Sequence, residues 1–138
     1  MTQKEYLSRG FEADIKIKSC LGYISELKER TVKVNSPISA IRGNGCNNKS
    51  HHEEILIKIM ELEREVEEEI NRLVTLKKEI AEAIDKISKP KERAVLSMRY
   101  LYMMRWEDIA DTLLCSKRYV YILHKNALKK IRVPQDNS

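Results

Sequence analysis

Hydrophobic residues recur every three or four positions along most of this 138-residue chain, which is the period of helices that bury one face. The longest regular run predicts a helix over residues 50–88. Its start is expected at Ser50, because Glu53 follows three positions later and completes a capping box. Ten apolar positions then follow with an average spacing of about 3.56 residues, between that of a coiled-coil seam and that of a plain amphipathic helix: Ile55, Ile59, Leu62, Val66, Ile70, Leu73, Leu76, Ile80, Ile84 and Ile87.

A second amphipathic helix is predicted over residues 3–30. Gly10 and Gly22 are expected to weaken it by about 1 kcal/mol each relative to alanine. Its single apolar stripe, which needs a partner, consists of Leu7, Phe11, Ile17, Leu21, Ile24 and Leu27. Residues 31–50 contain a Ser-Pro step and a Gly-Asn-Gly turn, so a loop is expected there. This loop is either a connector between the helices or a segment whose Arg42 contacts phosphate.

The apolar seam of the long helix has two candidate partners. The N-terminal helix can fold back on it as an antiparallel hairpin, or the same helix of another subunit can pair with it as a coiled coil. Because the N-terminal helix is the shorter one, part of the seam would stay uncovered in a monomer. Both contacts together are favoured, which predicts a homo-oligomer, with a dimer preferred.

Pro90 predicts a boundary between two regions, since the residue before a proline avoids the helical conformation and proline fits the first turn of a helix. We therefore expect a helical hairpin and oligomerisation region over residues 1–88 and a separate domain over residues 89–138. The first helix of that domain is predicted over residues 91–102, with Ala94, Val95, Met98 and Leu101 turned inward. Tyr100, Tyr102, Met103 and Met104 are expected to fill the core or an interface.

Residues 106–132 predict a helix, a tight turn and a second helix of about residues 116–132, which Ser116 can cap. The inward face of this motif consists of Trp106, Ile109, Ala110 and Leu113 from the first helix and Val120, Leu123, Ala127, Leu128 and Ile131 from the second. The outward face of the second helix carries Lys117, Arg118, Tyr121, Ile122, Lys125 and Lys129. This is the layout of a helix-turn-helix, whose second helix enters the major groove of DNA.

The stretch from Ser88 to Arg132 resembles region 4 of bacterial sigma factors. The features that match are VL-x-x-RY before the motif, W-x-x-IA at its start, S-x-x-x-V inside it and AL-x-x-I at its end. The usual turn glycine is absent, and Leu114 or Cys115 stands in its place, so a wider or slightly strained turn is expected. The resemblance implies binding to double-stranded DNA, with RNA polymerase as a further candidate partner.

The middle of the chain, from RGNGCNNKSHHEE to AEAIDKI, is similar to small phage- and prophage-encoded proteins of the ArpU/RinA type of late transcription regulator. The two resemblances together imply an all-α protein, with a long antiparallel helical hairpin or coiled coil followed by a C-terminal sigma-region-4-like helix-turn-helix domain. They also imply a phage transcription regulator.

Charge is distributed unevenly along the chain and supports a nucleic-acid partner. Residues 1–52 carry a net charge of +4, residues 53–88 of −5 and residues 89–138 of +6. From Lys117 to Arg132 there are six basic residues and no acidic one. Such asymmetry indicates a C-terminal end that faces phosphate and a middle that does not. A solvated basic helix without a ligand is the alternative.

In the helix-turn-helix hypothesis, side chains of the second helix divide into two groups. Lys117, Arg118 and Tyr121 are expected at base edges, where arginine is the strongest reader because it forms two hydrogen bonds to guanine. Ile122 lies beside them on the same outward face. Lys125, Lys129 and Lys130 are expected on phosphates, and His124 at the surface or on the phosphate side.

Other classes of function have little support in the sequence. Motifs for nucleophilic, metal-dependent or nucleotide chemistry are absent, and no cofactor is expected. His51, His52 and Cys46 lack a further ligand at zinc-binding spacing. No apolar run approaches the roughly 18–20 residues that span a bilayer, and the N-terminus lacks a secretory core, so a cytoplasmic protein without a membrane partner is expected.

The prediction is thus a dimeric, sequence-specific DNA-binding regulator. Two alternatives stay open, a small terminase-like assembly protein for DNA packaging and a sigma-like adaptor of RNA polymerase. A ring of more than two copies would favour packaging, and a dimer on one discrete site would favour regulation.

Overall fold

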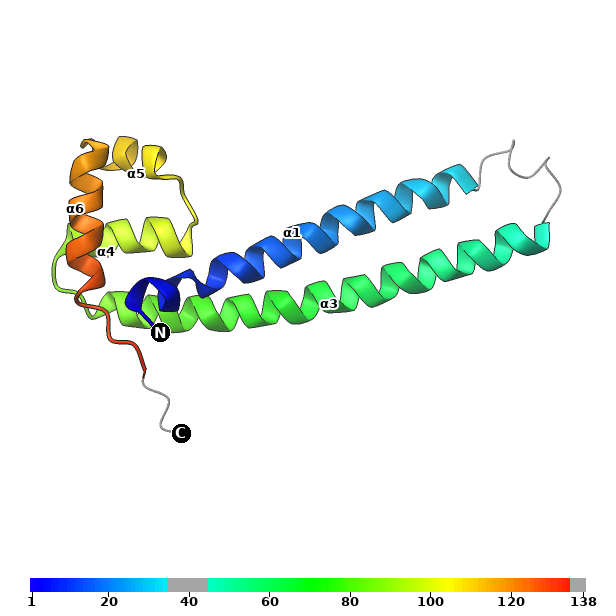
Figure 1. Ribbon diagram of the computed structural model, residues 1–138, viewed down its shortest axis with the longest axis horizontal. Coiled ribbons are helices and arrows are strands. Elements are labelled where there is room, and N and C mark those ends of the chain that lie inside the picture. Colours follow the sequence, from blue (N-terminus) through cyan, green and yellow to red (C-terminus); the bar gives the residue numbers. More distant parts are fainter. Residues whose placement is uncertain (35–44, 135–138) are drawn as a thin grey trace. The chain divides into compact units, whose positions relative to one another are not determined.

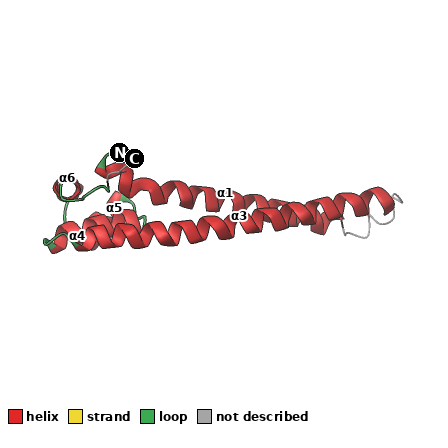
Figure 2. Ribbon diagram, turned by 90° about the horizontal axis from the view of Figure 1, so that it is seen from below, coloured by secondary structure: helices red, strands yellow, loops and turns green. Residues whose placement is uncertain are grey.

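The computed structural model describes residues 1–34 and 45–134, and helices are the only regular elements in these two ranges (Figure 2). The predicted all-α class is therefore confirmed for the described residues. In chain order the elements are α1 (Gln3–Val34), α3 (Gly45–Asp85), α4 (Pro90–Leu96), the π-helix η1 (Ser97–Leu101), α5 (Trp106–Leu113) and α6 (Lys117–Leu128) (Figure 1).

The limits of the two long helices differ from the predicted ones. Helix occupies residues 31–34 and 45–50 of the predicted loop, and the rest of that segment, Arg42 included, lies outside the described residues. Ser50 is consequently inside α3, and its predicted role in a capping box was wrong. A capping box does start α1, where the backbone N–H of Glu5 donates to Oγ1 of Thr2 and that of Thr2 donates to the Glu5 carboxylate.

The described residues divide into two compact units, one of residues 1–13 with 72–134 and one of residues 14–34 with 45–71. The first unit contains parts of both regions that the sequence analysis separated at residue 88. Its main core joins the start of α1, the end of α3, the end of α4, η1 and the end of α6, because each of these segments buries apolar side chains there. The residues of this core are Tyr6, Leu7, Ile80, Ile84, Ile87, Leu96, Tyr100, Ala127 and Ile131.

The second unit consists of the adjacent parts of α1 and α3, which run side by side in both views (Figures 1 and 2). Ion pairs between Lys16 and Glu69 and between Lys28 and Glu63 show that the two segments are antiparallel. Ile17, Ile24, Leu27, Ile55, Ile59, Leu62 and Val66 are buried. Most of the predicted stripes in this unit are thus confirmed.

Two residues of the predicted stripes are exceptions. Leu21 is 49% exposed and Ile70 is 44% exposed, so their predicted burial was wrong. At about 100° per residue, Leu21 and Ile70 point about 50–75° away from the centre of the stripe that their helix buries in this unit. Spacing of three or four residues alone does not reveal this offset.

The segment between the long helices and α5 contains a feature that the sequence did not predict. Lys89 is extended and Pro90 begins α4, as predicted. The helix then widens into η1, where the backbone N–H of Tyr102 donates to the Ser97 carbonyl, five residues back. Leu96 at the end of α4 and Tyr100 within η1 are buried. Ala94, Met98 and Leu101 are half-buried, while Tyr102 is 73% exposed rather than in the core.

Candidate nucleic-acid interface

Helices α5 and α6 pack on α4 around a small apolar core. Val95, Ile109, Ala110, Val120 and Leu123 are its buried members, and Trp106, Leu113 and Met98 are packed against it. The alanine leaves room where the two helices approach each other. The predicted inward face of both helices is confirmed, and it determines which side of α6 is left exposed.

The turn between α5 and α6 is closed by a leucine where a glycine would be usual. Leu114 has a left-handed backbone, with φ 55° and ψ 46°, and its side chain is 92% exposed. The N–H of Cys115 donates to the Ala110 carbonyl at 3.0 Å, which closes the end of α5. Ser116 then caps α6, because its Oγ accepts from the N–H of Tyr119 at 3.1 Å, as predicted.

Helix α6 is shorter than the predicted recognition helix of residues 116–132. It ends at Leu128, and turns formed by the N–H groups of Lys130 and Ile131 follow. Lys129 therefore lies just after the helix, and its side chain still continues the exposed face. The residues on that face are Lys117, Arg118, Tyr121, Ile122, Lys125 and Lys129, all exposed. Within the described residues no ion pair holds Arg118, Lys125 or Lys129.

Lys117 lies on the exposed face but is tied to α5. Its Nζ is 2.8 Å from Oε1 of Glu107. The hydrogen bond from Lys117 lowers the pKa of Glu107, and the same bond raises the pKa of Lys117. The pair links the first turns of the two helices, so this ammonium is already partly neutralised.

Lys130 also has a partner within the protein. Its Nζ is 2.5 Å from Oε2 of Glu92, a residue of α4 that is 2% exposed. A buried carboxylate needs a compensating charge, and Lys130 provides it from the end of α6. Of the seven candidate DNA-binding residues, Lys130 is the least available to a phosphate.

His124 is buried, and its predicted place at the surface or on the phosphate side was wrong. Its Nε2 is 2.7 Å from the hydroxyl of Tyr100, and its ring packs edge-on against Trp106. Burial lowers the pKa of His124 to about 4 and raises the pKa of Tyr100 to about 12. The signal was present in the sequence, because His124 follows Val120 by four positions and precedes Ala127 by three, on the buried stripe.

Arg99 closes the same aromatic cluster from the side of η1. Its guanidinium lies 4.5 Å from the ring centre of Trp106 and 5.3 Å from that of Phe11, and it donates to the Met104 carbonyl at 2.9 Å. Arg99 therefore holds the start of α5 in place and does not extend the exposed basic face of α6.

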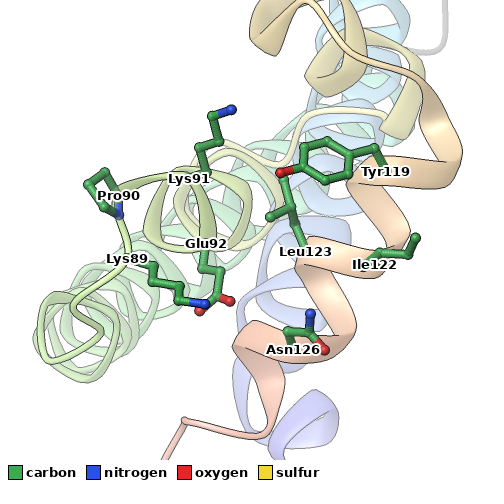
Figure 3. A pocket seen from close by; sticks show the side chains of 8 residues that line it. All are labelled: Lys89, Pro90, Lys91, Glu92, Tyr119, Ile122, Leu123 and Asn126. Atoms are coloured by element: carbon green, nitrogen blue, oxygen red, sulfur yellow. The ribbon is translucent and has the colours of Figure 1, made fainter.

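A groove of about 510 Å³ runs between the start of α4 and the exposed side of α6 (Figure 3). Tyr119, Ile122, Leu123 and Asn126 line it from α6, and the segment 89–92 lines it from α4. The Nζ of Lys91 lies 5.7 Å from the centre of the Tyr119 ring. Lys89 and Lys91 thus place two further cations next to the candidate interface. Neither lysine was predicted from the sequence to take part in it.

Neither a metal site nor a membrane span is found in the described ranges. No three histidine, cysteine or acidic side chains there are grouped so that they can bind a metal ion. His51 lies 3.9 Å from the carboxylate of Glu54, and the side chain of Cys46 falls outside the described part. None of the helices described is both long and apolar enough to cross a bilayer.

The model of one protein family matches residues 33–132, and that family is described as "Protein of unknown function (DUF1492)". The match covers well over half of the chain, so the protein belongs to this family. Neither the curated proteins nor the solved structures contain a match to the chain.

Proposed function

We propose that this member of the DUF1492 family binds double-stranded DNA through the exposed face of α6 and acts as a dimeric, sequence-specific transcription regulator of phage type. One observation carries the proposal. Arg118 and Lys125 of the capped helix α6, and Lys129 just after it, are exposed on one side, and none of the three has an acidic partner among the described residues. The resemblance of residues 88–132 to sigma region 4 supports the same reading.

The positions of these side chains suggest which of them contact bases and which contact phosphates. Arg118 lies in the first turn of α6, the part of a recognition helix that reaches base edges, and its fork can bind the two acceptors of guanine. Tyr121 and Ile122 are half-exposed and offer apolar contact to a thymine methyl group. Lys125 near the end of α6 and Lys129 just after it suit phosphates.

The two paired lysines have a different role in this proposal. Lys117 holds Glu107 and Lys130 holds Glu92, so each positions α6 on the rest of the unit. Lys117 can still contact DNA if a phosphate or base replaces its carboxylate partner. For Lys130 the same exchange would leave a buried carboxylate without a countercharge, which is costly.

The test is a footprint on the DNA that flanks the gene, at physiological salt, with the mass of the complex measured in parallel. We expect one discrete protected site bound by a dimer. Protection that is uniform and disappears with moderate salt would reflect only non-specific phosphate binding and would contradict the proposal.

Arg118→Ala tests the assignment of base reading. We expect a loss of about 1–3 kcal/mol on the protected site and a smaller loss on scrambled DNA, so that specificity falls. The matched control is Arg64→Ala, since Arg64 is an exposed arginine of α3. An equal loss on both DNAs would remove Arg118 from base reading.

A second candidate function is suggested by apolar side chains left exposed on the long helices, among them Val32 and Met60 at 72% and 68%. Such positions suit an assembly protein, either a small terminase-like oligomer or a sigma-like adaptor on RNA polymerase. Two measurements separate these candidates: the mass of the complex, and DNA binding with and without RNA polymerase. A complex of many copies would favour packaging, whereas binding only in the presence of polymerase would favour the adaptor.

A further inference from the structure

One surface of the unit formed by residues 14–71 carries apolar side chains that the unit itself leaves uncovered. On α1 they are Leu21 and Val32, which are 49% and 72% exposed. On α3 they are Leu56, Met60 and Ile70, with exposures of 42%, 68% and 44%. We call these five residues, together with Lys28 and Glu63, the exposed seam.

The exposed seam is organised around an ion pair. The Nζ of Lys28 lies 3.5 Å from Oε1 of Glu63, which fixes the point where α1 and α3 face each other. Leu21 and Ile70 each lie seven residues from the pair in one direction along the antiparallel helices, which is about 10.5 Å. Val32, Met60 and Leu56 lie three to seven residues away in the other direction. The surface is therefore apolar, then charged, then apolar again.

The spacing along each helix is that of a second helical contact. On α1, Leu21, Lys28 and Val32 are separated by seven and four residues. On α3, Leu56, Met60, Glu63 and Ile70 are separated by four, three and seven residues. Steps of three, four and seven residues keep side chains in line for a further helix to pack against.

We propose that the exposed seam binds the exposed seam of a second copy of this chain, about a two-fold axis parallel to the helices. This operation places α1 antiparallel to the partner's α3. Lys28 then faces the partner's Glu63, and Glu63 faces the partner's Lys28, while each apolar end meets the same end of the other copy. The result is a four-helix bundle with a self-complementary interface.

Charge selects this axis over the other two-fold arrangement of the same surface. An axis perpendicular to the helices would place Lys28 against the partner's Lys28. It would also bring together two α3 segments, each with a net charge of −5 over residues 45–71, whereas residues 14–34 of α1 carry +2. Opposite charges across an interface favour association and like charges oppose it.

The parallel axis also accounts for a polar residue within the surface. Glu67, which is exposed, lies one turn from Glu63 towards Ile70. In the proposed dimer it faces Ser25 of the partner subunit, whose hydroxyl can donate to a carboxylate. Because the axis runs along the bundle, both chains continue beyond residue 71 from the same end.

This inference deepens the dimer of the proposed function by naming its contact surface. It is tested without DNA, so that its failure leaves DNA binding by α6 untouched. The wild-type chain should have twice the 16.2 kDa of one copy in analytical ultracentrifugation at micromolar concentration. A monomer, or an assembly larger than two, would overturn it.

Two charge reversals distinguish contact between copies from contact within one copy. Lys28→Glu and Glu63→Lys each make both contacts between copies repulsive, and we expect association to weaken about tenfold or more. An equimolar mixture restores opposite charges between copies but leaves like charges within each copy. Recovery of the dimer mass in the mixture is the expected result. A mixture that stays monomeric would overturn the proposal.

A second pair of variants covers the case in which a charge reversal disturbs folding. Met60→Glu places a charge in the exposed seam, whereas Ile57→Glu places one on α3 outside it, at a residue that is 57% exposed. Circular dichroism should show the same helicity for both. We expect only Met60→Glu to lose the dimer, and equal loss in both variants would contradict the assignment of this surface.

Discussion

The ion pair between Lys130 and Glu92 predicts unequal costs for the loss of its two partners. Lys130→Ala leaves a carboxylate that is 2% exposed without its countercharge. Loss of one partner of a buried pair costs about 3–5 kcal/mol. Because the Lys130 side chain is 40% exposed and water can reach the site, we expect about 2–3 kcal/mol of lost stability.

Glu92→Gln should cost less, about 1 kcal/mol or below. The amide keeps a hydrogen-bond acceptor near Lys130, and the lysine can turn its ammonium to water. The double variant removes the buried charge altogether, so its stability should be close to that of Glu92→Gln alone. Non-additivity of this kind is expected for residues in direct contact.

The measurement is urea unfolding followed by the fluorescence of Trp106. This is the only tryptophan in the sequence, and it packs in the same unit as the pair. The free energy of unfolding at pH 7 should fall with little change in the denaturant slope. If Lys130→Ala stays within about 0.5 kcal/mol of wild type, or if Glu92→Gln lowers the free energy of unfolding more than Lys130→Ala does, Lys130 does not neutralise a buried charge on Glu92.

Three further outcomes are expected. Burial holds the pKa of His124 at about 4, below its ordinary value of 6.5, so the neutral ring contributes stability above pH 6.5 that is lost as the pH falls towards 4. The contribution is about 2–3 kcal/mol. Between pH 7.5 and pH 4.5, the free energy of unfolding should therefore fall less in His124→Gln than in the wild type. Leu114→Gly should raise stability by about 0.5–1 kcal/mol, since glycine adopts the left-handed backbone without strain and the leucine buries little; a lower urea midpoint would contradict this. Lys129→Ala should weaken all DNA sequences alike and reduce the salt slope by about one unit, and an unchanged slope would remove Lys129 from the DNA contact.

Periodicity was enough to predict the parts of the fold that depend on local pattern. The buried stripes of α3 and of the α5–α6 pair, the cap at Ser116 and the break at Pro90 all follow from spacing and from the chemistry of single residues. Each of these features is decided within one or two helical turns. The exposed face of α6 follows from them, because the residues opposite a buried stripe must face outward.

The features that the sequence did not reveal depend on contacts between distant residues. Glu92 and Lys130 are 38 positions apart, and Tyr100 and His124 are 24 apart. No local rule pairs them. The π-turn at Ser97 changes the phase of a helix whose sequence suits an ordinary α-helix. The assignment of α6 residues to bases and phosphates stays a prediction.

The contact between Trp106 and Tyr121 links the candidate interface to an optical signal. The two rings meet edge to face with centres 5.2 Å apart, and Tyr121 is 46% exposed on the proposed DNA-facing side of α6. A base or phosphate that moves Tyr121 would change the surroundings of the single indole behind it. Titration with unlabelled DNA should therefore alter the tryptophan emission when α6 is occupied and leave it unchanged when DNA binds elsewhere. The emission of Trp106 thus reports whether DNA occupies the exposed face of α6.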